Sequence, residues 1–222
     1  MSKNVFGESQ RLDLDRVNRD QTWLSGRASL PGQGGVALTQ EQADERYWRY
    51  NCIILTDGSD WTAYANDNTG MAAAIAAAAS GDTLWLPPCS LTASFTVPAS
   101  VTLHGISATD CVLTGQVTLS DGSALESLSI IRSEDDAGAV YGIACAEALT
   151  ASLRGVVVNV ANATGAAYGI YVTDASTFNA YETELVATTG SVGYAAYVAN
   201  GTLNHYSGRA VGTTALTPYW VT

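Results

Sequence analysis

A repeat that begins near residue 103 constrains the fold of this chain most strongly. Similar segments start at intervals of 22, 28, 28 and 25 residues, at Leu103, Leu125, Leu153, Tyr181 and Tyr206. A second register supports the first, because a tyrosine pattern recurs at about the same interval in Tyr141-Gly-Ile, Tyr168-Gly-Ile, Tyr194-Ala-Ala and Pro218-Tyr-Trp-Val. A period in the twenties with several short strands per unit indicates a solenoid, whose units bury their inner faces only by stacking on one another.

Among solenoids, the repeats favour a single-stranded parallel β-helix in an all-β chain. The leucine-rich-repeat signature LxxLxLxxN does not occur, and the repeats contain no helical pattern. Hydrophobic residues make up 47% of the chain and charged residues only 14%, a balance that suits tightly stacked strands better than a helical bundle. Equivalent positions of adjacent coils stack in such a fold, so Cys89 and Cys111 are expected to be neighbours. A β-sandwich remains the alternative, since it also combines alternating strands with turn signals.

An alanine-rich segment precedes the repeats. Residues 69–81 are uncharged and largely apolar, which predicts a helix that ends at Gly81 and is buried on all sides. A strand over Asp82-Thr-Leu-Trp-Leu, followed by two prolines, should come next. Because an uncapped solenoid exposes unpaired strand edges, we expect the helix to cap the first coil.

The first fifty residues differ from the rest in charge. Residues 1–50 carry seven basic and seven acidic side chains, whereas residues 51–222 carry three and fourteen, which accounts for the whole net charge of −11. Pro31 and three glycines mark a linker over residues 28–36, and Thr39 begins a short predicted helix. We therefore divide the chain into an N-terminal attachment segment, residues 1–50, and a β-helix domain, residues 51–222.

Charge, hydropathy and cysteine spacing argue against several classes of function. The acidic body would repel phosphate backbones, so nucleic acid is not expected as a partner. The chain shows no apolar run of membrane-spanning length and no secretion signal at its start, so we expect synthesis in the cytoplasm without membrane insertion. We expect no metal or other cofactor, and we expect free, buried thiols, because no metal-ligand spacing connects Cys52, Cys89, Cys111 and Cys145.

Residues 64–105 resemble the opening of the pectate-lyase-like superfamily. In that family an apolar helix of the form AI..AA....G.TV.LP.G.Y leads into the first strand, and the matching stretch here runs from Met71-Ala-Ala-Ala-Ile to Leu86-Pro-Pro. Val101-Thr-Leu-His-Gly-Ile resembles the family's next strand, while Cys89-Ser-Leu stands where the family has Gly-x-Tyr. The resemblance implies a right-handed parallel β-helix. It implies no particular activity, because that fold hosts lyases, hydrolases and inert spikes.

A second resemblance covers Leu38-Thr-Gln-Glu-Gln-Ala-Asp-Glu-Arg-Tyr-Trp. This stretch is similar to the LTQxQADxRYL segment that recurs in bacteriophage tail fibres and related virion proteins, often between an attachment region and a distal domain. The resemblance implies that residues 1–50 dock on other virion proteins of a tail or capsid. The residues that it assigns to this contact are Leu38, Ala43, Arg46, Tyr47 and Trp48.

Candidate site residues within the repeats are acidic or aromatic. Glu182 and Glu184 alternate on a predicted strand and would share one face, and tyrosines that include Tyr194 and Tyr197 recur along the solenoid. These four residues form a candidate glycan-binding set; solvated acids and a tyrosine ladder or subunit interface are the simpler interpretation. The acidic run Glu134-Asp-Asp is expected to be a solvated turn between coils. No motif or carboxylate spacing designates a catalytic residue.

These features together lead us to expect a structural virion protein of a tailed bacteriophage, such as a tail fibre, a tailspike or a capsid decoration. The apolar end Thr217-Pro-Tyr-Trp-Val is expected to lie against another subunit or virion protein, and the resemblance implies a homotrimer. A tailspike that cleaves host surface glycans is one alternative, although three arginines beyond residue 50 suit an anionic glycan poorly. A carbohydrate-binding module is the other.

Overall fold

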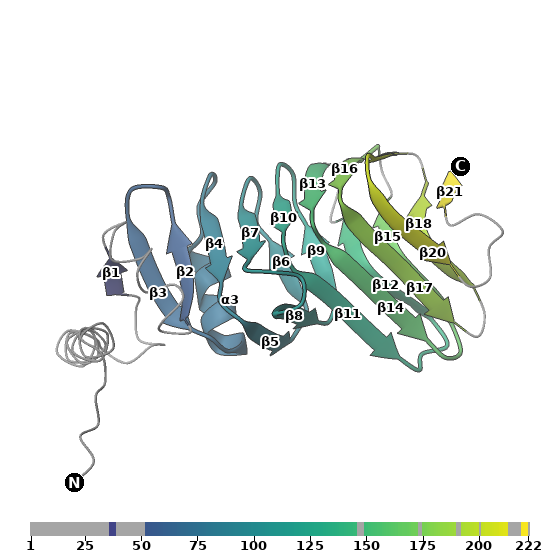
Figure 1. Cartoon of the computed structure of the whole chain (residues 1–222), viewed down its shortest axis with the longest axis horizontal. Helices are drawn as coiled ribbons and strands as arrows, with labels where there is room; N and C mark the ends of the chain where they lie inside the picture. Colours follow the sequence, from purple (N-terminus) through teal and green to yellow (C-terminus); the bar gives the residue numbers. More distant parts are fainter. Residues whose placement is uncertain are drawn as a thin grey trace, which may run out of the picture.

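The computed structural model describes residues 36–38, 52–145, 149–172, 175–189, 192–199, 201–212 and 219–221. The predicted helix at Thr39, and nearly all of the predicted attachment segment and linker, lie outside the described residues. Figure 1 shows an elongated body in which the strands succeed one another along the long axis.

From β4 onward the chain winds through three sheets, and each coil adds one strand to each sheet (Figure 1). Sheet A receives β4 (Thr83–Leu86), β7 (Thr102–Gly105), β10 (Ala124–Glu126), β13 (Thr150–Arg154), β16 (Thr177–Tyr181) and β19 (Thr202–His205). Sheet B receives β5 (Cys89–Thr92), β8 (Cys111–Thr114), β11 (Ser129–Glu134), β14 (Val157–Asn162), β17 (Thr183–Thr189) and β20 (Gly208–Gly212). Sheet C receives β6 (Phe95–Val97), β9 (Val117–Leu119), β12 (Ala139–Cys145), β15 (Ala166–Val172), β18 (Gly193–Val198) and β21 (Tyr219–Val221).

Equivalent strands of successive coils pair in parallel in all three sheets. A β-sandwich is built from antiparallel sheets, so this pairing excludes it. The predicted parallel β-solenoid is confirmed.

The register within sheet A confirms the first sequence repeat over three coils, where inward leucines pair in turn: Leu103, Leu125 and Leu153. The repeat is wrong at the next two positions. Leu153 pairs with Ala180 and not with Tyr181, and Ala180 pairs with His205 and not with Tyr206. A shift of one residue exchanges the two faces of a strand. Alanine therefore replaces leucine inside the solenoid, and the tyrosines lie outside.

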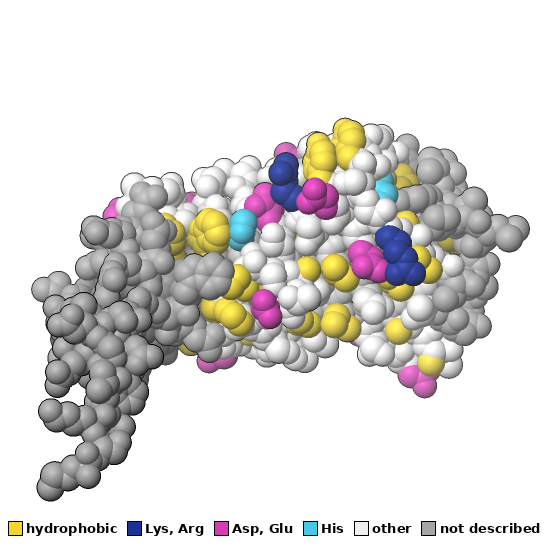
Figure 2. Space-filling model, in the orientation of Figure 1, with side chains coloured by type: hydrophobic (Ala, Val, Ile, Leu, Met, Phe, Trp, Pro, Cys, Tyr) yellow, Lys and Arg dark blue, Asp and Glu magenta, His cyan; other side chains and the backbone are white. Residues whose placement is uncertain are grey.

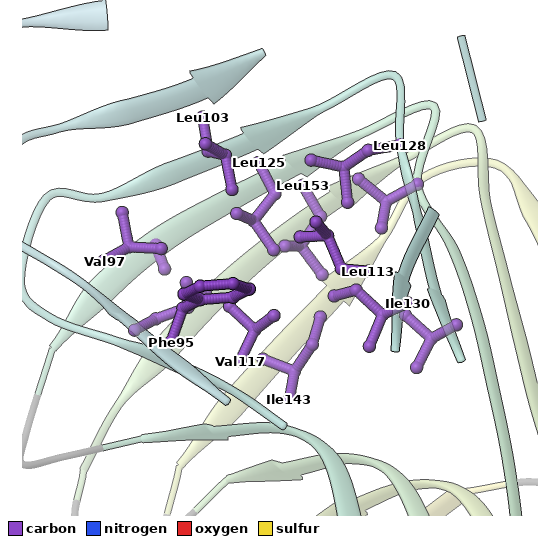
Figure 3. Close-up of a cluster of buried hydrophobic side chains, with 14 of the residues drawn as sticks. Phe95, Val97, Leu103, Leu113, Val117, Leu125, Leu128, Ile130, Ile143 and Leu153 are labelled. Atoms are coloured by element: carbon purple, nitrogen blue, oxygen red, sulfur yellow. The ribbon is translucent and has the colours of Figure 1, made fainter. Parts of the chain in front are cut away.

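The inward side chains of the three sheets form one continuous apolar core. Figure 3 shows part of it, where ladders face one another: Leu103, Leu125 and Leu153 from sheet A, Leu113 and Ile130 from sheet B, and Val117 and Ile143 from sheet C. Burial of one such side chain contributes about 1.5–3 kcal/mol. Stacking of side chains between coils is thus the main source of stability in this fold.

Two of the four cysteines confirm the predicted stacking. Cys89 and Cys111 pair in register between β5 and β8, and both are free and buried. The hydrogen bond between the two thiols, together with burial, raises the pKa of Cys89, and the same hydrogen bond lowers the pKa of Cys111 to about 7. Cys52 and Cys145 form no disulfide either, as predicted, but they are only half-buried.

The helix α3 (Asn68–Ala77) begins one residue before the predicted start. The Asp67 carboxylate caps it by accepting a backbone N–H of the first turn at 2.7 Å. The predicted end at Gly81 is wrong, because the chain becomes extended after Ala77. There the Asp82 carboxylate accepts from the backbone N–H of Ala79 at 2.8 Å and stabilises the turn into β4.

Only one face of α3 is buried, which corrects the expectation of a helix buried on all sides. The buried residues are Gly70, Met71 and Ala74, and the helix contacts β2 (Cys52–Thr56), β3 (Trp61–Ala65) and β6. The remaining alanines face away from these strands. Alanine is the best helix former and is small, so its exposure costs little.

Sheet A begins with antiparallel strands. β2 and β3 form a hairpin, and β2 also pairs with β4 at the start of the solenoid. β1 (Val36–Leu38) pairs with the outer edge of β3, so a strand from the predicted attachment segment extends this sheet. Ile54 and Trp61 make a second, small apolar cluster, against which Trp85 packs.

Replacement of Leu125 by alanine should lower the free energy of unfolding by about 2–5 kcal/mol, because this fully buried side chain lies between two other leucines of its ladder. Denaturant unfolding followed by circular dichroism measures the change. Thr102→Ala, on the outer face of the preceding coil, is the control and should change stability by less than about 0.5 kcal/mol. Equal losses from the two variants would contradict the assigned register.

Candidate functional site

The outer face of sheet A carries a row of aromatic and charged side chains, here called the outer row. Its members occupy equivalent positions of successive coils, namely Trp85, His104, Glu126, Arg154 and Tyr181. Figure 2 shows hydrophobic, histidine, acidic and basic side chains following one another along this face. Paired positions of neighbouring strands are about 4.8 Å apart, so successive members lie within contact distance.

The imidazole of His104 lies between Trp85 and Glu126. The ring centroids of Trp85 and His104 are 4.1 Å apart. His104 Nδ1 is 2.8 Å from Glu126 Oε2, and the two side chains are 27% and 32% exposed. The carboxylate fixes the orientation of the ring and directs Nε2 away from Glu126. This pair therefore presents an oriented hydrogen-bonding group at the surface.

The far end of the outer row is aromatic. Tyr181 stacks on Tyr206 with ring centroids 4.5 Å apart and an interplanar angle of 6°. The guanidinium carbon of Arg154 lies 5.5 Å from the centre of the Tyr181 ring, a cation–π contact. The row thus offers aromatic rings at both ends with an acid, a base and a cation between them. Such a surface can stack a sugar ring and hydrogen-bond to its hydroxyl groups.

The sequence contains a signal for the His104–Glu126 pair that motif searches miss. The 22-residue interval that stacks Leu103 on Leu125 also places His104 beside Glu126, one residue further along each strand. Neither residue belongs to a short catalytic or metal-binding motif. The pair becomes visible only when every position of the repeat is aligned, including the outward ones.

A second aromatic surface, the tyrosine face, lies on the outer side of sheet C and consists of Tyr141, Tyr168, Tyr171, Tyr194 and Tyr197. Tyr168 stacks between Tyr141 and Tyr194, with centroid distances of 5.3 and 5.7 Å. Tyr171 stacks on Tyr197 at 5.3 Å. Burial and, to a smaller extent, the neighbouring tyrosines raise the pKa of Tyr168. The tyrosines that recur in the sequence therefore form one connected cluster.

A glycine allows Tyr168 and Tyr171 to share one side of the sheet. In β15, Tyr168 and Tyr171 are three residues apart, a spacing that would place them on opposite faces of a regular strand. Both residues between them are buried, so the alternation is interrupted at Gly169. A Cβ at Gly142, the equivalent position of β12, would lie only 2.6 Å from Val158 Cγ1 in the core. The interruption in these coils thus requires a residue without a side chain.

Glu182 and Glu184 do not alternate on one strand, which corrects the prediction. Glu182 lies at the corner between β16 and β17 with φ 53°. Ser127 and Gly155 occupy the same corner in the preceding coils with φ 52° and 59°. The left-handed conformation therefore recurs where the chain passes from sheet A to sheet B, and it ends the strand before Glu182.

The four predicted glycan-binding residues are not brought together. Glu184 lies on sheet B, where its Oε1 accepts a hydrogen bond from Arg209 Nη1 at 2.7 Å. Tyr194 and Tyr197 lie on sheet C, with ring centroids 5.9 Å apart. The glutamates and the tyrosines thus belong to different outer faces. The two predicted tyrosines lie together in the tyrosine face, whereas the two glutamates lie outside it.

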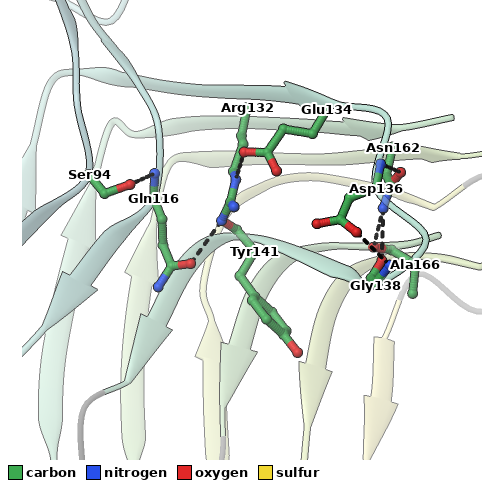
Figure 4. A network of polar contacts seen from close by, with 9 residues as sticks. All are labelled: Ser94, Gln116, Arg132, Glu134, Asp136, Gly138, Tyr141, Asn162 and Ala166. Atoms are coloured by element: carbon green, nitrogen blue, oxygen red, sulfur yellow. Dashed lines mark hydrogen bonds and ion pairs between the residues drawn. The ribbon is translucent and has the colours of Figure 1, made fainter. Parts of the chain in front are cut away.

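Arg132 connects sheet B to the start of the tyrosine face (Figure 4). Its Nη1 donates to Gln116 Oε1 at 2.8 Å and to the Tyr141 carbonyl oxygen at 3.0 Å. Its Nε donates to Glu134 Oε1 at 2.6 Å. The guanidinium therefore holds the strand that carries Tyr141 against the coil before it. This role is structural.

Glu134 ends β11, and the two aspartates that follow it lie in a turn, as predicted, but this turn joins β11 to β12 within one coil and not two successive coils. Asn162 of the next coil, which is 1% exposed, holds this turn (Figure 4). Its side-chain oxygen accepts from the backbone N–H of Asp136 at 3.2 Å, and its side-chain nitrogen donates to the Gly138 carbonyl at 3.0 Å. These hydrogen bonds show that the turn helps to hold two neighbouring coils together.

Four of the five predicted docking residues, Ala43, Arg46, Tyr47 and Trp48, lie outside the described residues, and the fifth, Leu38, ends β1. Among the described residues, no group of three histidine, cysteine or acidic side chains is placed to hold a metal ion. The same part of the chain contains no helix with the length and apolarity needed to span a membrane. No protein-family model matches the sequence, and neither the curated proteins nor the solved structures give a match.

Gly142→Val should lower the free energy of unfolding by about 1–3 kcal/mol and weaken the near-ultraviolet circular dichroism of the tyrosines, because the new side chain meets the core valines of β14. Gly138→Ala is the matched control, since its added methyl group would lie 3.4 Å from the nearest atom, Asp136 Oδ1. If Gly142→Val were as stable as wild type, the space between Gly142 and the valines of β14 would not be tightly packed.

Proposed function

We propose that this chain is a structural virion protein of a tailed bacteriophage, serving as a tail fibre, a tailspike or a capsid decoration. Residues 1–50 attach it to other tail or capsid proteins, and the solenoid projects from them. The chain is synthesised in the host cytoplasm and enters the virion as a homotrimer. Its task in this proposal is mechanical, because a projecting rod must keep its shape outside the cell.

One observation carries the proposal, namely the uninterrupted parallel stacking of coils around a single apolar core. Each described coil is hydrogen-bonded to its neighbours through sheets A, B and C. In a solenoid, each repeat contacts only the adjacent ones, so the fold extends in one direction and becomes a stiff rod. Side chains also connect the coils, as Asn162 and Arg132 do. Rigidity of this kind supports a role as a projecting element.

The proposal includes a right-handed winding and a cap formed by α3. Connections between parallel strands of one sheet are right-handed in about 98% of cases, which supports this hand. The contacts of α3 with β2, β3 and β6, at the beginning of the solenoid, support the capping role. A cap there would cover apolar side chains of the first coil, which have no preceding coil to stack on.

The attachment role rests on the segment from Leu38 to Trp48, which resembles the segment of phage tail proteins. The pairing of β1 with β3 supports it further, because this pairing joins Leu38, the first residue of that segment, to the solenoid. A segment anchored in this way transmits force from the attachment site to the rod. The aromatic residues Tyr47 and Trp48 are of the types that are enriched in protein interfaces.

The test is the incorporation of the chain into phage particles. Wild-type protein should be detected by mass spectrometry of purified particles. Cryo-electron microscopy should show residues 1–50 in contact with another tail or capsid protein and the solenoid projecting away from the particle surface. The triple variant Arg46→Ala, Tyr47→Ala, Trp48→Ala should keep its circular dichroism spectrum but fall at least tenfold in particle occupancy. Arg209→Ala, on the solenoid surface, is the control with wild-type occupancy. Absence of the wild-type chain from particles would overturn the proposal.

Glycan binding is the second candidate function, and the outer row favours it. Trp85 at one end and the stacked Tyr181 and Tyr206 at the other offer flat apolar surfaces, and the His104–Glu126 pair lies between them. The row runs along the solenoid axis, so it fits an extended polymer better than a small compact ligand. A tailspike that binds or cleaves a host surface glycan would use such a row.

Trp85→Ala and Tyr206→Ala should each weaken binding to the preferred glycan of a host-surface glycan array by roughly two- to tenfold, since an aromatic contact contributes about 0.5–1.5 kcal/mol. Thr118→Ala on sheet C is the control and should leave binding unchanged. Release of shorter oligosaccharides would indicate cleavage, and binding without release would indicate a binding module. No binding by the wild-type protein would remove this candidate.

A further inference from the structure

Sheet C differs from the other two sheets in its chemistry. Its six strands contain no acidic, basic or histidine residue. On its outer face, sheet A presents charged or titratable side chains at His104, Glu126 and Arg154, and sheet B presents them at Glu184 and Arg209. The protein therefore has two polar outer faces and one uncharged face, and the uncharged face is the one that carries the tyrosine cluster.

The chemistry of the tyrosine face is typical of the centre of a protein interface. Interface centres are depleted of charged residues and enriched in aromatic ones, and tyrosine is common among the residues that contribute most to binding. The hydroxyl group of tyrosine both donates and accepts hydrogen bonds, so one tyrosine surface can pair with an identical surface. The five rings already contact one another, as in the 4.6 Å contact between Tyr141 and Tyr171. Less side-chain freedom is therefore lost when a partner binds.

The charge of the chain indicates which partner this face accommodates. Residues 51–222 carry the whole net charge of −11, so two copies of the solenoid repel each other. The repulsion is smallest when the copies meet through the sheet that bears no charged side chain. A cationic partner would instead be attracted to acidic groups, which sheet C does not offer on its strands. The face is therefore suited to a second copy of the same chain.

We propose that sheet C is the face through which copies of this chain associate, with the tyrosine face at the centre of the contact. The inference deepens the proposed function, because it assigns the homotrimer interface that the virion role includes. The contact is centred on β12, β15 and β18, where all five tyrosines lie. The outer row of sheet A then points away from the contact and stays accessible. Three copies around a common axis would thus expose sheets A and B and cover sheet C.

The decisive experiment compares the mass of the purified full-length chain with that of two double variants by sedimentation equilibrium. Wild type should have a multiple of the 23.1 kDa chain mass. Tyr168→Arg with Tyr171→Arg should shift the mass to that of one chain. Arginine makes the net charge less negative, so the dissociation could not come from greater overall repulsion. Tyr181→Arg with Tyr206→Arg is the matched control on sheet A, with the same change of charge, and should keep the wild-type mass.

If the variant Tyr168→Arg with Tyr171→Arg does not fold, a measurement on the wild-type chain still tests the interface. Hydroxyl-radical footprinting, read by mass spectrometry, reports the solvent access of each tyrosine. Modification of Tyr168 and Tyr194 should fall several-fold when the protein is concentrated enough to associate, whereas modification of Tyr206 should not change. A wild-type mass of one chain, dissociation of the sheet A variant alone, or equal footprints of the sheet C tyrosines at both concentrations would overturn the inference.

The failure of this inference is distinguishable from the failure of the proposed virion role. If the chain associates through sheet C but is missing from phage particles, the interface stands and the virion role falls. If the chain is found in particles as single copies with accessible sheet C tyrosines, the virion role stands and the interface falls. Mass and particle occupancy are measured independently, so neither result depends on the other.

Discussion

In-register stacking of inward side chains between coils is the interaction on which the rest of the structure depends. Leu125 packs between Leu103 and Leu153, and similar ladders run through the other two sheets. No single coil has a core of its own, so each coil is stable only through its neighbours. This dependence explains why the inward positions are almost all aliphatic. It also explains why Gly142 stands where any side chain would meet the valines of β14.

The same stacking organises the three outer faces, because every outward position also repeats once per coil. Sheet A thereby acquires a row in which His104 meets Glu126 and Arg154 meets Tyr181. Sheet B acquires ion pairs such as Glu184 with Arg209. Sheet C acquires stacked tyrosines without any charge on its strands. One solenoid can therefore present a polar face for a ligand and a neutral face for another copy at the same time, which is the division that the proposed functions need.

A substantial part of the fold follows from the sequence, and the predictions that are wrong concern details that side-chain contacts and local backbone conformation decide. The repeat interval correctly predicts the parallel stacking, the leucine ladder and the pairing of Cys89 with Cys111. The interval is wrong by one residue at Tyr181. The core position of that coil is occupied by Ala180, and the larger Tyr181 beside it looks in the sequence like the core residue. The strand prediction at Glu182 is wrong for another reason, since a left-handed corner without glycine gives no signal in the sequence. The predicted helix end at Gly81 is wrong as well, because the chain turns after Ala77 into a loop in which the Asp82 carboxylate accepts a backbone hydrogen bond.

The sequence by itself determined that the chain is a solenoid, because a period in the twenties permits burial of apolar side chains only by stacking. It also determined that the first fifty residues differ in charge from the rest. The tertiary structure alone decided which outward residues meet, since contacts across coils join positions more than twenty residues apart. His104 with Glu126, and Tyr168 with Tyr194, are separated in the chain but adjacent in the sheet. Candidate sites of a solenoid lie on such rows, and so they appear only when the coils are placed in register.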